Sequence, residues 1–397
     1  MDEWVECKIS DIGTVVGGAT PSTKKPENYE DGKIAWITPK DLSTFSGRYI
    51  ERGERNITEV GLKSCSTQLL PKNTVLFSSR APIGYVAIAA NEVCTNQGFK
   101  SVIPNENTDP LFLFYLLKYN KDKIEGMGSG TTFKEVSGNT MKNIVVSVPR
   151  DKSVQKKIAD ILSSIDDKIE ENERINDNLE QQAELLYHER FETVDRDKLP
   201  VGWRIVRLGD VATISKKSFN PAKEPEMLLE HYSIPAFDEA HFPVFEPSTA
   251  IKSNKFIIDD SCFMISKLNP TTKRVWKPYC LTENAVCSTE FIVYKAKSQE
   301  ITDFLYSVID SASFSDFMCS HVTGSTGSRQ RTTPSDTLAF ELVLPNAKEI
   351  AEYQGIVSPM LEQIKCNAIE NDRLKRLRDS LLPKLMSGEI DVSGIQL

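Results

Sequence analysis

The chain repeats itself once, and residues 199 positions apart match at both ends of the repeat. Trp4 and the run Ile9–Ile12 match Trp203 and the run Leu208–Val211 in pattern. Near the end of each half, four further residues recur at the same offset: Gln155, Ile165, Asn172 and Arg174 match Gln354, Ile364, Asn371 and Arg373. The middles of the halves match only weakly. Because self-similarity marks a repeated structural unit, the sequence predicts one architecture used twice on a shared framework.

Each half ends in a segment with the apolar spacing of a long helix. Apolar residues recur at alternating intervals of four and three, which is typical of a coiled-coil seam. The seam residues expected to pair the two helices are Ile158, Leu162, Ile165, Ile169 and Asn172 in the first half and Leu361, Ile364 and Asn371 in the second. Some 38 residues would form a rod roughly 55–60 Å long.

Either helix alone would bury only one stripe, so we expect the two helices to pack against each other. Asn172 and Asn371 occupy the same seam position, and a buried pair of asparagines would fix the register of the helices. Exposure of both asparagines on a frayed seam is the alternative. No Gly or Pro interrupts residues 151–192, and the second helix is expected to stop near Pro383 and Ser387-Gly388.

The rest of each half predicts a mixture of short strands and helices between turn-forming residues. Strands are expected at 33–37, 74–77, 85–88 and 144–148 with a helix at 111–118, and in the second half strands at 262–265, 290–294 and 340–344 with a helix at 301–317. The predicted organisation is one domain over 1–150, a long helix over 151–192, a second domain over 193–346, and a second helix with a C-terminal tail over 347–397. The predicted fold class is therefore α+β.

The net charge of −8 is unusual for a protein that binds a polyanion, but the excess acid is concentrated in one segment. Residues 151–192 hold six basic and twelve acidic side chains, so the two domains are nearly neutral and each has room for a local basic surface. The sequence has no apolar run of roughly 18 residues and no Cys-x-x-Cys pair. We expect a cytoplasmic protein with reduced thiols, no membrane partner and no metal.

A search for catalytic motifs finds none, so we predict no catalytic residue and no cofactor bound by this chain. The run Gly17–Lys24 lacks the second glycine of a phosphate-binding loop. The run Asn269–Thr272 lacks the second proline and the aromatic residue of an amino-methyltransferase loop. Carboxylates between Glu27 and Asp31 are spaced too closely for a metal-dependent nuclease.

Polar, basic loops occur at matching places in the two halves. Hydroxyl, amide and cationic donors of this kind suit contacts with DNA phosphates and base edges, although each residue is also compatible with a solvated turn. The candidate DNA-binding residues are Thr20, Ser22, Lys24, Lys25, Lys40, Ser79 and Arg80 in the first half and Lys267, Asn269, Thr271, Lys273, Arg274, Ser325, Arg329, Gln330 and Arg331 in the second.

With these features in place, the chain resembles the specificity subunit of type I restriction-modification systems across nearly its full length. The segments similar to that family are Trp4 with Ile9–Ile12, Gly18–Pro21 with Gly32–Trp36, Ser79–Gly84, Thr95–Gly98, Gly324–Arg331 and Ser380–Glu389. Gly324–Arg331 and Ser380–Glu389 are the most specific of these. The second half has Ser266-Lys267-Leu-Asn-Pro where the first has Ser79-Arg80-Ala-Pro-Ile-Gly, which leaves the geometry of the second loop open.

The resemblance implies two target recognition domains related by a pseudo-two-fold axis and separated by two long antiparallel coiled-coil helices. It implies a bipartite, asymmetric site on double-stranded DNA, with each domain reading one half and the helices setting the spacer. It further implies docking of two methyltransferase subunits that use S-adenosylmethionine, and of restriction subunits that use ATP and Mg²⁺. The alternative is a non-catalytic coiled-coil scaffold whose repeated domains bind protein.

Overall fold

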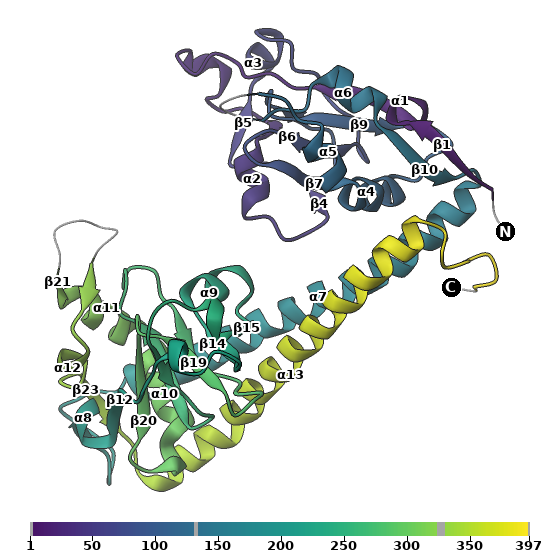
Figure 1. Ribbon diagram of the computed structural model, residues 1–397. Helices are drawn as coiled ribbons and strands as arrows, with labels where there is room; N and C mark the ends of the chain where they lie inside the picture. The colour runs from purple at the N-terminus through teal and green to yellow at the C-terminus, as the bar shows by residue number, and fades with distance from the viewer. Residues whose placement is uncertain (1–2, 131–133, 324–329, 396–397) are drawn as a thin grey trace. The chain divides into compact units, whose positions relative to one another are not determined.

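The computed structural model describes residues 3–130, 134–323 and 330–395. They divide into two compact units, residues 1–170 with 373–397 and residues 171–372. Each unit contains one mixed head of strands and short helices together with part of two long helices, α7 (Lys152–Tyr187) and α13 (Ala347–Met386) (Figure 1). The predicted α+β fold class is confirmed.

Head 1 runs from β1 to β10 and is built around a five-stranded sheet. Its strands are β1 (Trp4–Lys8), β2 (Gly13–Gly17), β3 (Ile34–Ile37), β4 (Tyr49–Ile50), β5 (Arg55–Ile57), β6 (Val75–Ser79), β7 (Ile83–Ala89), β8 (Cys94–Thr95), β9 (Lys100–Pro104) and β10 (Val145–Pro149). Its helices are α1 (Ile9–Ile12), α2 (Pro39–Ser43), α3 (Glu59–Lys63), α4 (Pro110–Tyr119), α5 (Lys121–Gly126) and α6 (Gly138–Asn143). The main sheet has the order β2-β9-β6-β7-β4, a smaller sheet has the order β5-β3-β8, and β1 pairs with β10.

Head 2 runs from β11 to β23 and reuses the central part of this topology. Its strands are β11 (Arg204–Arg207), β12 (Ala212–Ser215), β13 (Ser218–Phe219), β14 (Leu228–Tyr232), β15 (Val244–Pro247), β16 (Lys255–Ile257), β17 (Cys262–Ser266), β18 (Val275–Trp276), β19 (Ala285–Ser288), β20 (Phe291–Ala296), β21 (Val322–Thr323), β22 (Arg331–Thr332) and β23 (Glu341–Leu344). Its helices are α8 (Leu208–Val211), α9 (Ile234–Ala240), α10 (Thr302–Asp310), α11 (Ala312–Ser320) and α12 (Pro334–Thr337). The order β12-β20-β17-β18 corresponds to β2-β9-β6-β7, and β11 pairs with β23 as β1 pairs with β10.

The second sheet of head 2 is larger than its counterpart. The parallel pair of β3 with β8 recurs as β14 with β19, and the antiparallel neighbour β5 recurs as β15. Strands β13 and β16 extend this sheet to the order β13-β16-β19-β14-β15. Within the described part of the chain, the two heads also differ in that the main sheet of head 2 has no strand at the place of β4 and that β21 pairs with β22, while the four strands β2, β9, β6 and β7 all have counterparts.

Residues at the matching ends of the repeat perform the same local task in both heads. Asp11 accepts a hydrogen bond from the backbone N–H of Lys8 at 2.8 Å and caps α1, and Asp210 does the same for Arg207 and α8 at 2.9 Å. The side chain of Gln155 accepts from the backbone N–H of Asp109 beside α4. The side chain of Gln354 likewise accepts from a backbone N–H at the start of α10. The repeat in sequence is thus a repeat of capping interactions.

The buried apolar faces of the long helices belong to the head cores. Ile158 and Leu162 of α7 join the head 1 core, where Leu385 and Met386 of α13 also pack. In the second unit, Ala183 and Tyr187 of α7 pack with Tyr353 and Val357 of α13 in the head 2 core. The helix α13 ends at Met386, directly before Ser387-Gly388, as expected, and burial of Leu385 and Met386 explains why it continues past Pro383.

Within each unit the two long helices run antiparallel. In the first unit, Arg378 of α13 forms an ion pair with the buried Asp166 of α7 at 2.8 Å. In the second unit, Asn172 donates to Asn371 Oδ1 at 2.9 Å, and Asn367 donates to Asn176 Oδ1 at 2.8 Å. The contact between Asn172 and Asn371 therefore joins two residues that occupy equivalent positions in the repeat.

Two helical segments have other bounds than those expected from the sequence. Residues 301–317, expected as one helix, form α10 and α11, because Ser311 leaves the helical conformation and caps α11 by accepting from the N–H of Phe314. The helix expected over 151–192 ends at Tyr187 and is followed by a π-helical turn, His188–Glu192.

Among the described residues, no helix combines the length and apolar character that spanning a bilayer requires.

Candidate nucleic-acid interface

In head 1, the loop after β2 is held against the connector after β8. The backbone N–H of Ala19 donates to the carbonyl oxygen of Thr95 at 3.0 Å, and Trp36 Nε1 donates to the carbonyl of Ala19 at 3.2 Å. The hydroxyl of Thr20 donates to the side-chain oxygen of Gln97. These contacts bring the segments 18–21 and 95–98, which are far apart in the sequence, into one surface.

Gly18 is required for this close approach. A Cβ atom at residue 18 would lie 2.2 Å from the carbonyl oxygen of Thr95 and 2.3 Å from that of Asn96. Both oxygens belong to the backbone, so neither can be rotated away as a side chain can. A side chain at position 18 would therefore push the loop off the connector.

The tip of the loop projects into solvent. The hydroxyl of Tyr29 donates to the carbonyl of Pro21 at 2.6 Å, and the buried Asn28 donates to the carbonyl of Ser22 at 3.0 Å. These bonds pin the backbone while the side chains of Ser22, Lys24 and Lys25 stay exposed. Within the described part of the chain, neither lysine has a carboxylate at ion-pair distance.

The segment after β6 lies on the other side of the same connector. The backbone N–H of Ser79 donates to the carbonyl of Gly98 at 2.7 Å, and its hydroxyl donates there at 3.1 Å. Ser79 is fully buried, so its hydroxyl shapes the loop from inside. Arg80 is partly exposed and lies 3.7 Å from Glu135, which also pairs with Lys100 at 3.3 Å. The connector thus joins the two loops, and we call residues 18–25, 95–98 and Arg80 the head 1 loop surface.

Lys40 stands apart from this surface, on α2. Its ammonium is exposed and forms an ion pair with Glu54 at 2.7 Å. The hydrogen bond to Glu54 raises the pKa of Lys40. A neighbouring carboxylate weakens the attraction of this lysine for a phosphate.

In head 2, the loop after β17 is paired with the strand that follows the Gly-Ser-rich segment. The backbone N–H of Asn269 donates to the carbonyl of Gln330 at 3.0 Å, and the N–H of Thr332 donates to the carbonyl of Lys267 at 3.1 Å. In head 1, Arg80 forms the equivalent isolated bridge with Glu135. The loop whose geometry the sequence left open therefore makes the same kind of contact. We call residues 267–272 with 330–331 the head 2 loop surface.

The candidates on the head 2 loop surface differ in accessibility. Thr271 is exposed, Lys267 and Gln330 are partly exposed, and the side-chain oxygen of Asn269 is buried. The guanidinium of Arg331 binds both carboxylate oxygens of Glu290, at 3.0 and 3.2 Å. This arrangement raises the pKa of Arg331 and holds its guanidinium in one orientation. Ser325 and Arg329 lie outside the described residues.

Lys273 and Arg274 are engaged within the protein. Lys273 pairs with Glu184 of α7 at 3.2 Å and with Asp310 of α10 at 3.0 Å. Burial acts to lower the pKa of Lys273, but these carboxylates raise it overall. Arg274 forms a two-pronged pair with Asp238 of α9 at 2.5 and 2.8 Å. Their contacts attach the loop to neighbouring helices, which is a structural task that the sequence did not indicate.

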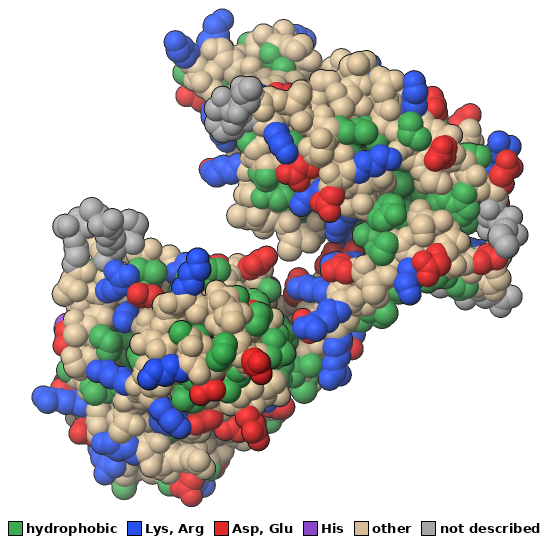
Figure 2. All heavy atoms as spheres, in the orientation of Figure 1, with side chains coloured by type: hydrophobic (Ala, Val, Ile, Leu, Met, Phe, Trp, Pro, Cys, Tyr) green, Lys and Arg blue, Asp and Glu red, His purple; other side chains and the backbone are tan. Residues whose placement is uncertain are grey.

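The surfaces are mixed in charge, and two contributors were not among the sequence candidates. Figure 2 shows lysine and arginine side chains interspersed with carboxylates on both heads. Gln97 is exposed on the head 1 loop surface, and Glu290 orients Arg331 on the head 2 loop surface. Thr95–Gly98 was recognised only as a family segment, and the repeat offers no signal for Glu290. Within residues 3–130, 134–323 and 330–395, no three His, Cys, Asp or Glu side chains form a group able to hold a metal ion.

Comparison with known proteins gives consistent matches. The profile of the type I restriction modification DNA specificity domain matches residues 1–181. The chain is 34% identical to the type I restriction enzyme MjaIX specificity subunit of Methanocaldococcus jannaschii, over 99% of this chain and 95% of that protein. It is 23% identical to the HindI specificity subunit of Haemophilus influenzae, over 98% of this chain and all of that protein.

The fold has a counterpart among solved structures. The crystal structure of the type I restriction-modification S subunit from M. genitalium superposes with a TM-score of 0.62 over 97% of this chain and 96% of that one. The two sequences are 16% identical, so this similarity concerns the fold alone.

Proposed function

The chain belongs to the family of type I restriction-modification specificity subunits, and on that premise we propose how its two heads divide the recognition of DNA. Specificity subunits determine the DNA sequence on which a multisubunit enzyme acts and are not themselves catalytic. In our proposal, the head 1 loop surface reads one half of a bipartite target and the head 2 loop surface reads the other. The paired helices α7 and α13 set the unread spacer between the halves.

One observation carries this proposal: the two heads share a framework but present different side chains at equivalent loops. Head 1 offers Arg80 after β6 and an exposed Gln97 after β8, whereas head 2 offers Lys267 after β17 and pairs this loop with Gln330 and Arg331. Amide and guanidinium groups form two-pronged hydrogen bonds with adenine and guanine in the major groove. Different donors at equivalent positions support the reading of different half-sites.

The proposal assigns the chemistry to other subunits. Two methyltransferase subunits would bring S-adenosylmethionine, and restriction subunits would bring ATP and Mg²⁺. The long helices, shared by both units, are the proposed docking site for the methyltransferase subunits. The assignment of individual loop residues follows their exposure: Thr20, Ser22, Lys24, Lys25, Gln97 and Arg80 in head 1, and Lys267, Thr271, Gln330 and Arg331 in head 2.

The test of this function is the methylation pattern that the chain imposes. Cells that express the chain with its methyltransferase partner are expected to carry methylated bases at one bipartite sequence with a fixed spacer. Cells with the partner alone are expected to lack them, and sequencing that detects modified bases distinguishes the two. Methylation without any sequence preference, or an unchanged pattern when the chain is removed, would favour the protein-binding scaffold.

The two unpaired lysines at the tip of the head 1 loop give a quantitative prediction. The double substitution Lys24→Ala/Lys25→Ala is expected to weaken binding to all DNA sequences by similar factors. Each lost phosphate contact reduces the slope of log affinity against log salt by about 0.9, so the slope should fall by about 1.8. Titration of the complete methyltransferase complex at several salt concentrations measures this slope.

Lys142 provides the matched control for this prediction. It is an exposed lysine on α6, outside the head 1 loop surface. Lys142→Ala removes one positive charge and is expected to leave the salt slope unchanged within error. A slope change for Lys142→Ala half as large as that of the double substitution would mean that the lysines act only through net charge.

A further inference from the structure

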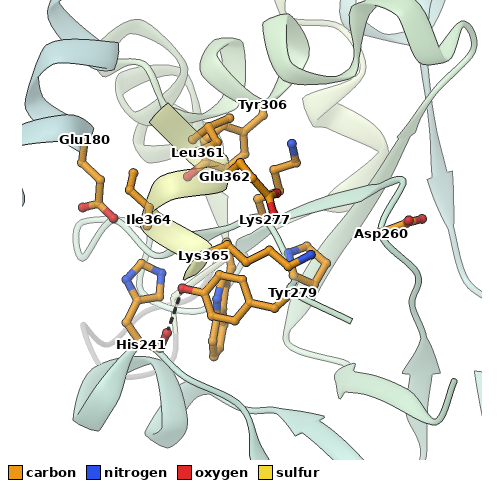
Figure 3. A pocket seen from close by; sticks show the side chains of 12 residues that line it. Glu180, His241, Asp260, Lys277, Tyr279, Tyr306, Leu361, Glu362, Ile364 and Lys365 are labelled. Atoms are coloured by element: carbon orange, nitrogen blue, oxygen red, sulfur yellow. Dashed lines mark hydrogen bonds between the residues drawn. The ribbon is translucent and has the colours of Figure 1, made fainter. Parts of the chain in front are cut away.

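The second unit contains a cavity that recognition of DNA does not use. It has a volume of about 250 Å³ and lies between head 2 and the long helices (Figure 3). Glu180 of α7, Lys365 of α13 and the aromatic side chains of Tyr279 and Tyr306 are among the residues that line it. All of these residues belong to one unit, so the cavity does not depend on how the two units are placed.

The corresponding part of the first unit has different contacts. Residues of α13 that line it, including Ile364 and Lys365, correspond in the repeat to Ile165 and Asp166 of α7. In the first unit, Arg48 reaches from head 1 to this part of α7. Its buried guanidinium donates to the carbonyl of Ser163 at 3.3 Å and pairs with Glu170 at 3.1 Å.

In the first unit, the carboxylate of Asp166 has partners within the protein. Asp166 accepts a hydrogen bond from the hydroxyl of Tyr115 at 2.6 Å and pairs with Arg378 at 2.8 Å. Lys365 occupies the repeat position of Asp166, yet among the described residues it has neither an ion pair nor a hydrogen bond through its side chain. The second unit therefore has an unpaired lysine beside a cavity where the first unit has a carboxylate with two partners.

The cavity has a second unpaired charge of the opposite sign. The carboxylate of Glu180 has no hydrogen-bond or ion-pair partner in the described part of the chain. In Figure 3 the carboxylate of Glu180 lies at the left of the view, and the side chain of Lys365 lies nearer the centre, beside the ring of Tyr279. Lys277, which also lines the cavity, is already paired with Asp303.

We propose that this cavity binds a short aliphatic zwitterion, with its cationic end at Glu180, its carboxylate at Lys365 and its methylene chain against Tyr279 and Tyr306. An ω-amino carboxylate has this chemistry. Each end would supply the ion pair that the protein lacks, and the aromatic walls would bury the apolar chain. The proposal does not depend on the recognition of DNA.

The charged groups around Glu180 are mostly carboxylates, which favours binding of a cation there. Burial, together with Asp310 and Asp177, raises the pKa of Glu180 to about 7, and Lys273 only partly offsets this. His241 contributes no positive charge near neutral pH, because burial lowers its pKa to about 4. Glu184, Glu362 and Asp260 also face this region. A cationic ligand would favour ionised Glu180, so we expect affinity to increase as the pH rises from 5 to 8.

Calorimetric titration of the full chain with 6-aminohexanoate tests the proposal, with hexanoate and hexylammonium as single-charge analogues. The zwitterion is expected to bind at least about tenfold more tightly than either analogue, since each charged hydrogen bond contributes roughly that factor or more. The shorter 4-aminobutanoate and 5-aminopentanoate establish the span between the two charges. This comparison uses the unmodified protein and so does not rely on a variant that folds.

Two variants then identify the ends of the site. Glu180→Gln is expected to weaken the zwitterion at least about tenfold while leaving hexanoate unchanged, and Lys365→Met is expected to weaken the zwitterion and hexanoate alike. Glu189→Gln, at an exposed glutamate beyond α7, is the matched control and should change nothing. The proposal is overturned if no zwitterion of the series binds better than its single-charge analogues, or if Glu180→Gln binds as the unmodified chain does.

Discussion

Replacing Gly18 with alanine is expected to abolish recognition of the half-site read by head 1, with methylation of the bipartite target reduced at least about a hundredfold. The added Cβ would lie 2.2 Å from the carbonyl oxygen of Thr95, so the loop must leave the connector at 95–98. Thr20 and Gln97 would separate, and Lys24 and Lys25 would move with the loop. Losing the equivalent of two base-pair contacts, at about 1–3 kcal/mol each, accounts for the expected factor.

Gly17 provides a matched control for this prediction. A Cβ atom at residue 17 would come no closer than 4.0 Å to a neighbour, the carbonyl oxygen of Phe99. Gly17→Ala is therefore expected to retain methylation close to that of the unmodified protein. Methylation rates on the target, measured with the purified complex, compare the two variants, and thermal unfolding checks that both remain folded. Full activity of Gly18→Ala would show that the loop surface does not contact the half-site.

The framework of the fold was predictable because it rests on residues that act locally and occur twice. Asp11 and Asp210 cap their short helices three residues along the chain, and a sequence comparison detects such a pair directly. The seam of the long helices follows from heptad spacing, and Asn172 with Asn371 occupies one position of that spacing. Because capping residues and heptad spacing occur in both halves, each half supports the structure predicted for the other.

The state of the candidate cations was not predictable, because it depends on carboxylates that are distant in the sequence. Lys273 pairs with Glu184, 89 residues away, and Arg331 pairs with Glu290, 41 residues away. A basic run in a sequence predicts positive charge, but only the tertiary arrangement determines how much of that charge is offered to solvent. Gln97 was missed for the same reason, because its contact with Thr20 joins residues 77 positions apart in the sequence.

The cavity near Glu180 is a second feature that the sequence alone did not predict. Nothing in the sequence marks Glu180 or Lys365, since both lie within a charged helical pattern. Only a comparison of the two units distinguishes them, because Asp166, at the repeat position of Lys365, has two partners within the protein. Internal repeats therefore reveal specialised sites as differences between copies that share a framework.

Deleting one matched heptad from both long helices is expected to shorten the spacer of the methylated target by about three base pairs. The deleted residues are Glu173–Leu179 of α7 and Ile364–Glu370 of α13, which lie opposite one another between the pair Asn172 with Asn371 and the head 2 core. Seven residues at about 1.5 Å each remove roughly 10 Å, and the duplex rises about 3.4 Å per base pair. Both half-site sequences are expected to remain the same, and sequencing of modified bases in cells reports them together with the spacer.

The deletion keeps the helical seam in phase, because a heptad changes the facing direction of a helix by only about 20°. The duplex, by contrast, turns by nearly a third of its 10–10.5 base-pair repeat over three base pairs, so we expect slower methylation at the new spacing. The double substitution Asn176→Leu/Asn367→Leu removes a hydrogen bond within the deleted stretch without changing helix length, and it should leave the spacer as it was. An unchanged spacer after the double deletion would mean that the distance between half-sites is set by the partner subunits. Since those subunits are proposed to dock on the same helices, only a change of helix length separates the two explanations.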